Sequence, residues 1–102
     1  MSFEIRLTVT TAAASLAIIG ALEGSASHVF QGPAHAALQL DQPEITLDFA
    51  GLDGMDTAAA GMLILFNAAA KARGKTVVII NPTQPVLEAL NRSHLGKLIT
   101  IL

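Results

Sequence analysis

The first part of the chain switches between two patterns of apolar residues. Residues 3–9 alternate apolar and polar side chains, which is the period of a half-buried strand with one solvent face. Residues 15–22 are apolar on both faces, as in a central strand. Because only the short stretch 10–14 separates the two runs, we predict that they pair as a hairpin.

Residues 23–40 change to helical spacing, with Ser25 or Ser27 as the expected cap. Pro33 stands inside this segment, where a proline costs about 3 kcal/mol in a helix. We therefore expect a kink, or a fresh helix that begins at Gly32–Pro33. The apolar stripe of the segment consists of Phe30, Ala34, Ala37 and Leu38.

The rest of the chain alternates strands with helices. The expected elements are a strand over 44–52, a helix over 58–73, a strand over 75–80, a helix within 81–96 and a last strand over 97–102. The order is therefore β-β-α-β-α-β-α-β. It predicts an α/β fold with a mixed, mostly parallel sheet of about five strands, covered by helices. A length of 102 residues fits one domain, 1–102.

Composition and charge remove several classes of function. The chain is 52% hydrophobic and 14% charged, it has no cysteine, and its net charge is -2 without a basic run. These values argue against disorder, disulfides, thiolate metal sites and nucleic-acid binding. Residues 10–27 resemble a secretory signal, but Glu4 and Arg6 cancel the positive segment that such a signal needs. No apolar run approaches the ~20 residues of a membrane helix, so we expect a cytoplasmic protein that does not insert into membranes.

Candidate chemistry gathers just before the most apolar helix. Asp53, Asp56 and Thr57 interrupt a small and apolar stretch between the strand over 44–52 and the helix over 58–73. One interpretation is structural, because Asp and Thr oxygens accept hydrogen bonds from free N–H groups at a helix start. The other is a switch, because a phosphate on Thr57 would add about -1.5 to -2 charge beside two carboxylates.

Other motifs give weaker signals. Gly74–Lys75–Thr76 matches the end of a phosphate-binding loop, but the upstream glycine is missing and the motif enters a strand. His28 and His35 share a helix face without a third ligand, so we expect no metal site. No base stands at a suitable spacing from a serine, and we expect neither an enzyme nor a bound cofactor.

Residues 45–75 resemble the central segment of STAS domains, a family that includes bacterial anti-sigma factor antagonists. The family's strand motif Leu-Asp-Leu corresponds to Leu47–Asp48–Phe49, and its loop motif Asp-Ser-Ser-Gly-Leu-Gly corresponds to residues 56–61. The end of the family's second strand, Gly-x-Leu-Asp, corresponds to Gly20, Leu22 and Glu23. Residues 86–101 are similar to the family's last helix and strand. The order and spacing of these segments carry the resemblance.

The resemblance implies a partner-switching regulator. In the family, the hydroxyl residue directly after the loop aspartate is phosphorylated by a Ser/Thr kinase that is also an anti-sigma factor, and a phosphatase resets it. Thr57 occupies that position, and Asp56 is expected to help its hydroxyl meet the kinase. The expected partner-binding residues are Glu23, Asp53, Asp56, Thr57, Ala58, Ala59 and Gly61.

The loop also departs from the family pattern. Ala58 replaces the second serine and Ala59 replaces the first glycine. A threonine at the switch position also occurs in STAS subunits of lipid-transport ABC complexes. An alternative is therefore a non-catalytic subunit held by a transporter ATPase, in which Thr57 is only a helix cap. A small-molecule-binding module that uses the strand ends is a third possibility.

Overall fold

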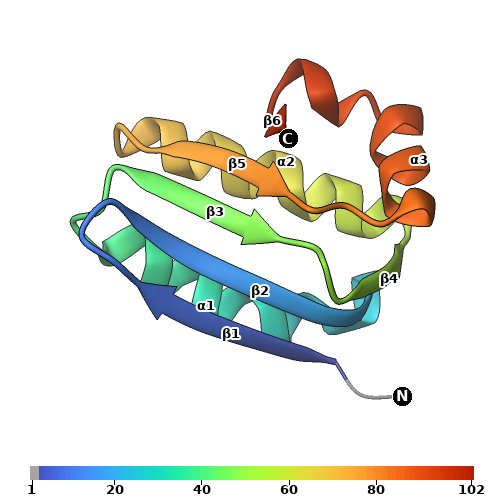
Figure 1. Cartoon of the computed structure of the whole chain (residues 1–102), viewed down its shortest axis with the longest axis horizontal. Coiled ribbons are helices and arrows are strands. Elements are labelled where there is room, and N and C mark those ends of the chain that lie inside the picture. The colour runs from blue at the N-terminus through green and yellow to red at the C-terminus, as the bar shows by residue number, and fades with distance from the viewer. Residues whose placement is uncertain (1–2) are drawn as a thin grey trace.

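Residues 3–102, the part of the chain that this computed structural model describes, fold into one six-stranded sheet with three α-helices (Figure 1). The mixed α/β architecture predicted from the sequence is confirmed. The elements in chain order are β1 (Glu4–Val9), β2 (Ala13–Leu22), α1 (Ser27–Gln39), β3 (Glu44–Asp48), β4 (Leu52–Met55), α2 (Thr57–Ala72), β5 (Thr76–Ile80), α3 (Gln84–Arg92) and β6 (Thr100–Ile101). Two short 3-10 turns, Gly24–Ala26 and Leu95–Lys97, complete them.

The sheet has the strand order β1-β2-β3-β5-β6. β1 and β2 pair antiparallel, as the predicted hairpin requires, and the remaining neighbours pair parallel. The backbone N–H of Thr10 donates to the Ala13 carbonyl at 2.9 Å and closes the turn between them. Parallel strands place their carboxyl ends along one edge of the sheet, and loops at that edge are where sites form in open α/β folds.

The single strand predicted over 44–52 is in fact two strands. β3 ends at Asp48, whose carboxylate accepts a hydrogen bond from the Ala50 backbone N–H at 3.0 Å. A further bond from Leu52 N–H to the Phe49 carbonyl, 3.0 Å long, turns the chain. β4 then leaves β3 and pairs with the end of β2, where the register shifts after Gly20. The pairing of β4 with β2 places the residues before α2 beside the end of β2.

α1 runs unbroken from Ser27 to Gln39 with Pro33 inside it, so the predicted restart at Gly32–Pro33 is wrong. Phe30 on one side of the proline and Ala34 and Ala37 on the other are buried in the core. This packing offsets the hydrogen bond that a proline removes. The cap position is Ala26 and neither of the two predicted serines.

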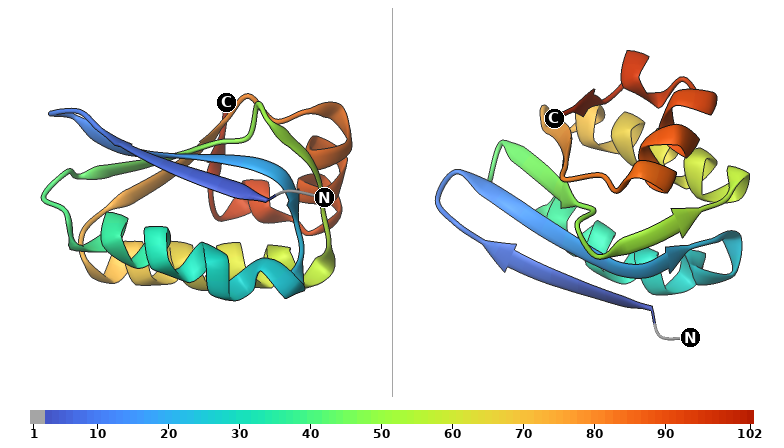
Figure 2. Two further views of the ribbon diagram at one scale, coloured as in Figure 1. Left: turned by 90° about the horizontal axis from the view of Figure 1, so that it is seen from below. Right: turned by 45° about the vertical axis from the view of Figure 1, so that its right-hand side comes forward.

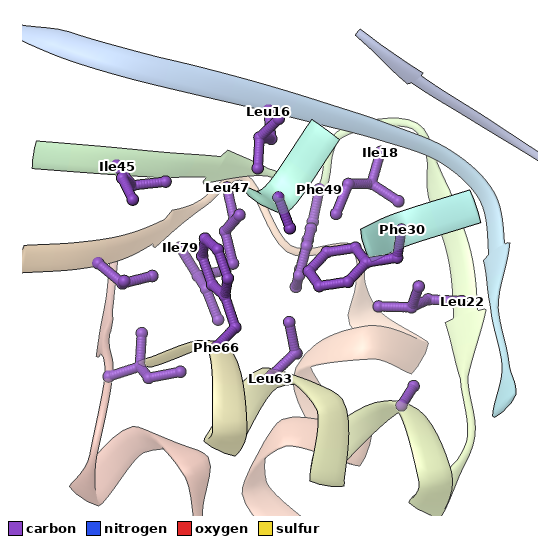
Figure 3. Close-up of a cluster of buried hydrophobic side chains, with 14 of the residues drawn as sticks. Leu16, Ile18, Leu22, Phe30, Ile45, Leu47, Phe49, Leu63, Phe66 and Ile79 are labelled. Atoms are coloured by element: carbon purple, nitrogen blue, oxygen red, sulfur yellow. The ribbon is translucent and has the colours of Figure 1, made fainter. Parts of the chain in front are cut away.

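The core lies between the sheet and the helices α1 and α2, which run side by side along one face of the sheet (Figure 2). The sheet contributes alternate residues such as Leu16, Ile18 and Leu47, and the helices contribute Phe30 and Phe66 (Figure 3). The two phenylalanine rings meet edge to face with centroids 5.7 Å apart. The prediction that helices cover the aliphatic face of the sheet is confirmed.

The last strand is shorter than predicted. Residues 95–97 form a 3-10 turn, and only Thr100 and Ile101 add to the sheet beside β5. Buried Leu95 and Ile99 hold this segment, and the Asn67 side chain donates to the Leu98 carbonyl at 3.3 Å. None of the helices within residues 3–102 combines the length and the apolarity needed to cross a bilayer.

Two leucines of α2 test which face of this helix supports the fold. Leu63 is 0% exposed and Leu65 is 73% exposed. We expect Leu63→Ala to lower the free energy of unfolding by about 3 kcal/mol, because it leaves a cavity in the core. Leu65→Ala should change it by less than about 0.5 kcal/mol. Urea unfolding of both variants measures the difference, and equal losses would contradict the placement of α2.

Candidate functional site

The loop singled out by the sequence lies where β4 ends and α2 begins, beside the end of β2 (Figure 1). Met55 pairs with Leu22 in the parallel β2–β4 ladder. The next residue, Asp56, donates its backbone N–H to the Leu22 carbonyl at 3.2 Å. The first turn of α2 is thereby fixed against the segment that follows β2.

Asp56 is the N-cap of α2. Its backbone is extended, with φ -101° and ψ 179°, and its Oδ1 accepts a hydrogen bond from the Ala59 N–H at 2.8 Å. The second oxygen, Oδ2, accepts from the Gly24 N–H at 3.1 Å. One carboxylate therefore satisfies a free donor of the helix and ties the helix start to the 3-10 turn after β2.

Position 24 has no room for a side chain, so this junction requires glycine. A Cβ built on Gly24 would lie 2.9 Å from the Cβ of Ala58, which is closer than such atoms approach. A side chain at position 24 would push the turn away from α2. The bond from the Gly24 N–H to Asp56 would then lengthen.

The two backbone hydrogen bonds also set the charge of Asp56. The Ala59 N–H, followed by the Gly24 N–H, holds the pKa of the Asp56 carboxyl below its ordinary value of 3.8, against the opposing effect of desolvation. Asp56 is thus a carboxylate at neutral pH. Its two oxygens are already engaged by the backbone, so its structural role is established by geometry.

Thr57 is the first residue of α2 and is not its cap. The interpretation of Thr57 as a structural helix cap is wrong, because Asp56 fills that position one residue earlier. The Thr57 side chain is exposed, and its hydroxyl has no hydrogen-bond partner among residues 3–102. It is a free hydroxyl at the positive end of a 16-residue helix.

A groove of about 640 Å³ opens beside Thr57, between the first turns of α2 and the end of α3. Small and apolar side chains make up most of its walls, and two charged groups, Asp56 and Arg92, line it as well. The lining residues are Met55, Asp56, Thr57, Ala60, Gly61, Ile64, Ala89, Arg92 and Ser93. The exposed side chain of Ile64 leaves apolar surface available for contact.

The structure brings together most of the predicted partner-binding residues. Asp53 is exposed on β4, Ala58 is exposed on the first turn of α2, and Gly61 lines the groove. Glu23 is exposed at the end of β2, directly before the turn that Asp56 holds. Ala59 is the exception, because its methyl group is 0% exposed and belongs to the core. No partner can touch that side chain, and we leave it out of the candidate surface.

Sequence reasoning missed the contribution of α3. Ala89, Arg92 and Ser93 are at least 25 positions away from Ile64, and only the packing of α3 against β4 brings them to the groove. A basic residue in the last turn of a helix is ordinary in itself, because it suits the negative helix end. No local pattern marks Arg92 as a neighbour of Thr57.

A second hollow, of about 430 Å³, lies between α1 and α2 and is more apolar. Its walls include Phe30, Leu38 and the largely exposed Leu65. His35 also lines it, but within the described residues no group of three or more His, Asp or Glu side chains is placed to hold a metal ion. Thr57 lies outside this hollow.

Residues 5–100 match the family described as Mlab, STAS domain. The chain belongs to the STAS domain family. The match covers nearly the whole chain, including both the Thr57 groove and the hairpin. No curated protein matches this STAS domain in sequence.

Solved structures share the fold at low sequence identity. An anti-sigma factor antagonist from Mycobacterium paratuberculosis aligns with a TM-score of 0.87 at 8% identity, over 98% of this STAS domain and 85% of its own chain. The anti-sigma factor antagonist SpoIIAA in its unphosphorylated form aligns at 0.78 and 20% identity, over 99% and 88%. The Bacillus cell fate determinant SpoIIAA in the phosphorylated form aligns at 0.70 and 20% identity, over 99% and 91%.

The cap geometry predicts that two adjacent substitutions affect stability to different extents. Asp56→Ala removes acceptors for the Ala59 and Gly24 N–H groups, so we expect the free energy of unfolding to fall by about 1 to 2 kcal/mol. Thr57→Ala removes no such bond and should change it by less than about 0.5 kcal/mol. Thermal and urea unfolding measure both. A Thr57→Ala variant that loses as much stability as Asp56→Ala would contradict the assignment of the cap.

The lowered pKa of Asp56 predicts how stability depends on pH. Since the folded-state pKa lies below the unfolded value of 3.8, the carboxylate stabilises the fold above that value. This contribution fades as pH falls through 3.8 and then through the folded-state pKa. The stability difference between the native chain and Asp56→Asn should therefore be largest near neutral pH and shrink in acid. A difference that stays constant down to about pH 3 would contradict the account.

Proposed function

We propose that this STAS domain is a partner-switching regulator of the anti-sigma factor antagonist kind, and that reversible phosphorylation of Thr57 switches it. The proposal rests on the different roles of Asp56 and Thr57 at the start of α2. Asp56 supplies the cap, and the neighbouring Thr57 side chain is left exposed at a groove whose walls are mostly small and apolar. A hydroxyl that supports no structure can be modified without cost to the fold.

The modification is an ordinary phosphoryl transfer from ATP. The Thr57 Oγ1 forms a bond to the γ-phosphorus, the bond between that phosphorus and the bridging β–γ oxygen breaks, and ADP leaves. The hydroxyl proton passes to a base of the kinase. A phosphatase reverses the change by transferring the phosphoryl group to water. The partners in this scheme are a Ser/Thr kinase that is also an anti-sigma factor, and a separate phosphatase.

The physical effect of the phosphate is local. It adds about -1.5 to -2 charge at a position that already has Asp56 beside it and Asp53 on the adjoining strand. Most of the side chains that line the groove next to it are small or apolar, which suits close docking of a protein surface, and Arg92 is the basic residue among them. In the unmodified state the partner docks there, and in the modified state it meets concentrated negative charge. The existence of SpoIIAA in both a phosphorylated and an unphosphorylated form supports a switch of this kind on the same fold.

In this proposal the domain works in the cytoplasm and has no catalytic activity of its own. The groove holds one hydroxyl from Thr57, one from Ser93 and a carboxylate from Asp56. The Ser93 hydroxyl donates to the Ala89 carbonyl at 2.9 Å, and the Asp56 oxygens accept backbone N–H groups. The Ser93 hydroxyl and the Asp56 carboxylate are therefore both committed to holding helix ends, and the free Thr57 hydroxyl has no uncommitted carboxylate among the residues that line the groove.

A second candidate is a permanent, non-catalytic subunit of a larger assembly such as a lipid-transport ABC system, held by its ATPase through the same groove. Ala58 and Ala59 at the loop, together with threonine at position 57, favour it. The matching family description also names Mlab and not an anti-sigma factor antagonist. This candidate predicts no phosphate on the protein from its own cells and co-purification with an ATPase.

Intact-mass measurement separates the two candidates. After incubation with its cognate Ser/Thr kinase and ATP, we expect the chain to gain one phosphate, because the Thr57 hydroxyl is exposed and free. Thr57→Ala should gain none. Thr8→Ala, which removes another exposed threonine, should behave as the native chain does. A phosphate that still appears on Thr57→Ala, or no phosphate on the native chain, would reject the switch.

Binding to the kinase tests the consequence of the charge. Thr57→Ala should bind as the unmodified chain does, whereas Thr57→Glu should bind about tenfold more weakly or worse, because like charges at an interface cost several kcal/mol. Thr57→Gln is the matched control, since it has the size of glutamate without the charge. Calorimetric titration gives the three affinities. Equal affinities for the alanine and glutamate variants would contradict the mechanism of charge repulsion.

A further inference from the structure

Arg92 is the basic side chain that lines the Thr57 groove. It is the last residue of α3, and its side chain is exposed. The groove places it on the wall opposite the start of α2, with Ala89 and Ser93 beside it. Among the nine lining residues the charged ones are Arg92 and Asp56.

Within residues 3–102, Arg92 forms no ion pair. The salt bridge in this part of the chain joins Arg6 and Glu4. Glu88 stands one turn earlier on α3, but its carboxylate is hydrogen-bonded to the Gln84 side chain at 3.4 Å. The Asp56 carboxylate already accepts two backbone N–H groups. The guanidinium of Arg92, a residue that lines the groove, is therefore without a committed acceptor among residues 3–102.

A phosphate on Thr57 would supply the acceptor that is missing. It has three strong acceptor oxygens, and a guanidinium is the side-chain group that matches them with two parallel hydrogen bonds. Both residues line one groove, and arginine is the longest and most flexible side chain among its lining residues. The rest of the groove wall is apolar or small and offers the phosphate no competing cation.

We propose that Arg92 receives the phosphate of Thr57 and that this pair closes the groove. The inference rests on the proposed function in one respect, namely that Thr57 carries a phosphate. Phosphorylation then blocks the partner in two ways. It adds negative charge to the rim, and it fills the groove between α2 and α3 with a salt bridge that belongs to the chain itself. The switch is thereby partly intramolecular.

The test uses a phosphothreonine placed at position 57 by peptide ligation, so that no kinase is involved. Phosphorus NMR at about 0.1 M salt follows the second ionisation of the phosphate, whose ordinary pKa is about 6. Asp56 and Asp53 raise this pKa and Arg92 lowers it. Since the two aspartates are the same in every variant, the comparison between variants isolates the arginine.

The variants are Arg92→Gln and, as a matched control, Arg73→Gln. Arg73 follows the last residue of the same 16-residue helix, so it is about 24 Å from Thr57, well beyond the Debye length of about 10 Å at 0.1 M salt. We expect Arg92→Gln to raise the phosphate pKa by about half a unit, the shift expected from an exposed ion pair. Arg73→Gln should leave it unchanged.

A second measurement guards against an indirect effect of the substitution. In the native sequence with phosphothreonine, the Nε–H signal of Arg92 should move with the same midpoint as the phosphorus signal. An Arg92 signal that does not follow the phosphate, or equal phosphate pKa values in the two glutamine variants, overturns the proposal. Such a result leaves the proposed function intact, because the kinase reaction is measured separately.

Discussion

The hydrogen bonds of the Asp56 carboxylate are the constraint on which the rest of the site depends. The bond from the Ala59 N–H fixes the residue at which α2 begins. The bond from the Gly24 N–H ties the start of α2 to the turn that follows β2. Two segments 32 positions apart are thus held by one side chain. Because the cap is supplied at position 56, the next residue has no structural duty, and its hydroxyl is presented at the rim of the groove. The proposed switch depends on these separate roles of Asp56 and Thr57.

The elements that depend on local pattern could be predicted from the sequence. The hairpin of β1 and β2, the helix α2 and the strand β5 follow from apolar spacing and from Gly74 after the helix. β4 could not be found in this way, because it has four residues with a glycine among them and is defined by pairing with β2. Pro33 predicts a break that α1 does not have, since the helix-breaking tendency of a proline is local and the packing that overrides it is tertiary.

The candidate site could be predicted only in part, because local sequence pattern does not record tertiary packing. Asp56 and Thr57 stand next to each other in the sequence, and a shift of one residue decides which of them caps the helix. Residue type alone does not settle it, because both are common caps. Ala59 was assigned to the surface by its place in the motif, but the helical turn points it into the core. Arg92 reaches the groove by the folding of α3 onto β4, which no spacing along the chain records.

The central claim is that the groove beside Thr57 is where a partner docks. Its most direct test is a titration of the isotope-labelled chain with the unlabelled cognate kinase, followed by amide NMR signals. The account predicts that the signals of Thr57, Gly61 and Ile64 move or broaden first, and that those of β1 stay in place. Changes that gather instead in the hollow between α1 and α2, around Gln31 and Leu65, would contradict it.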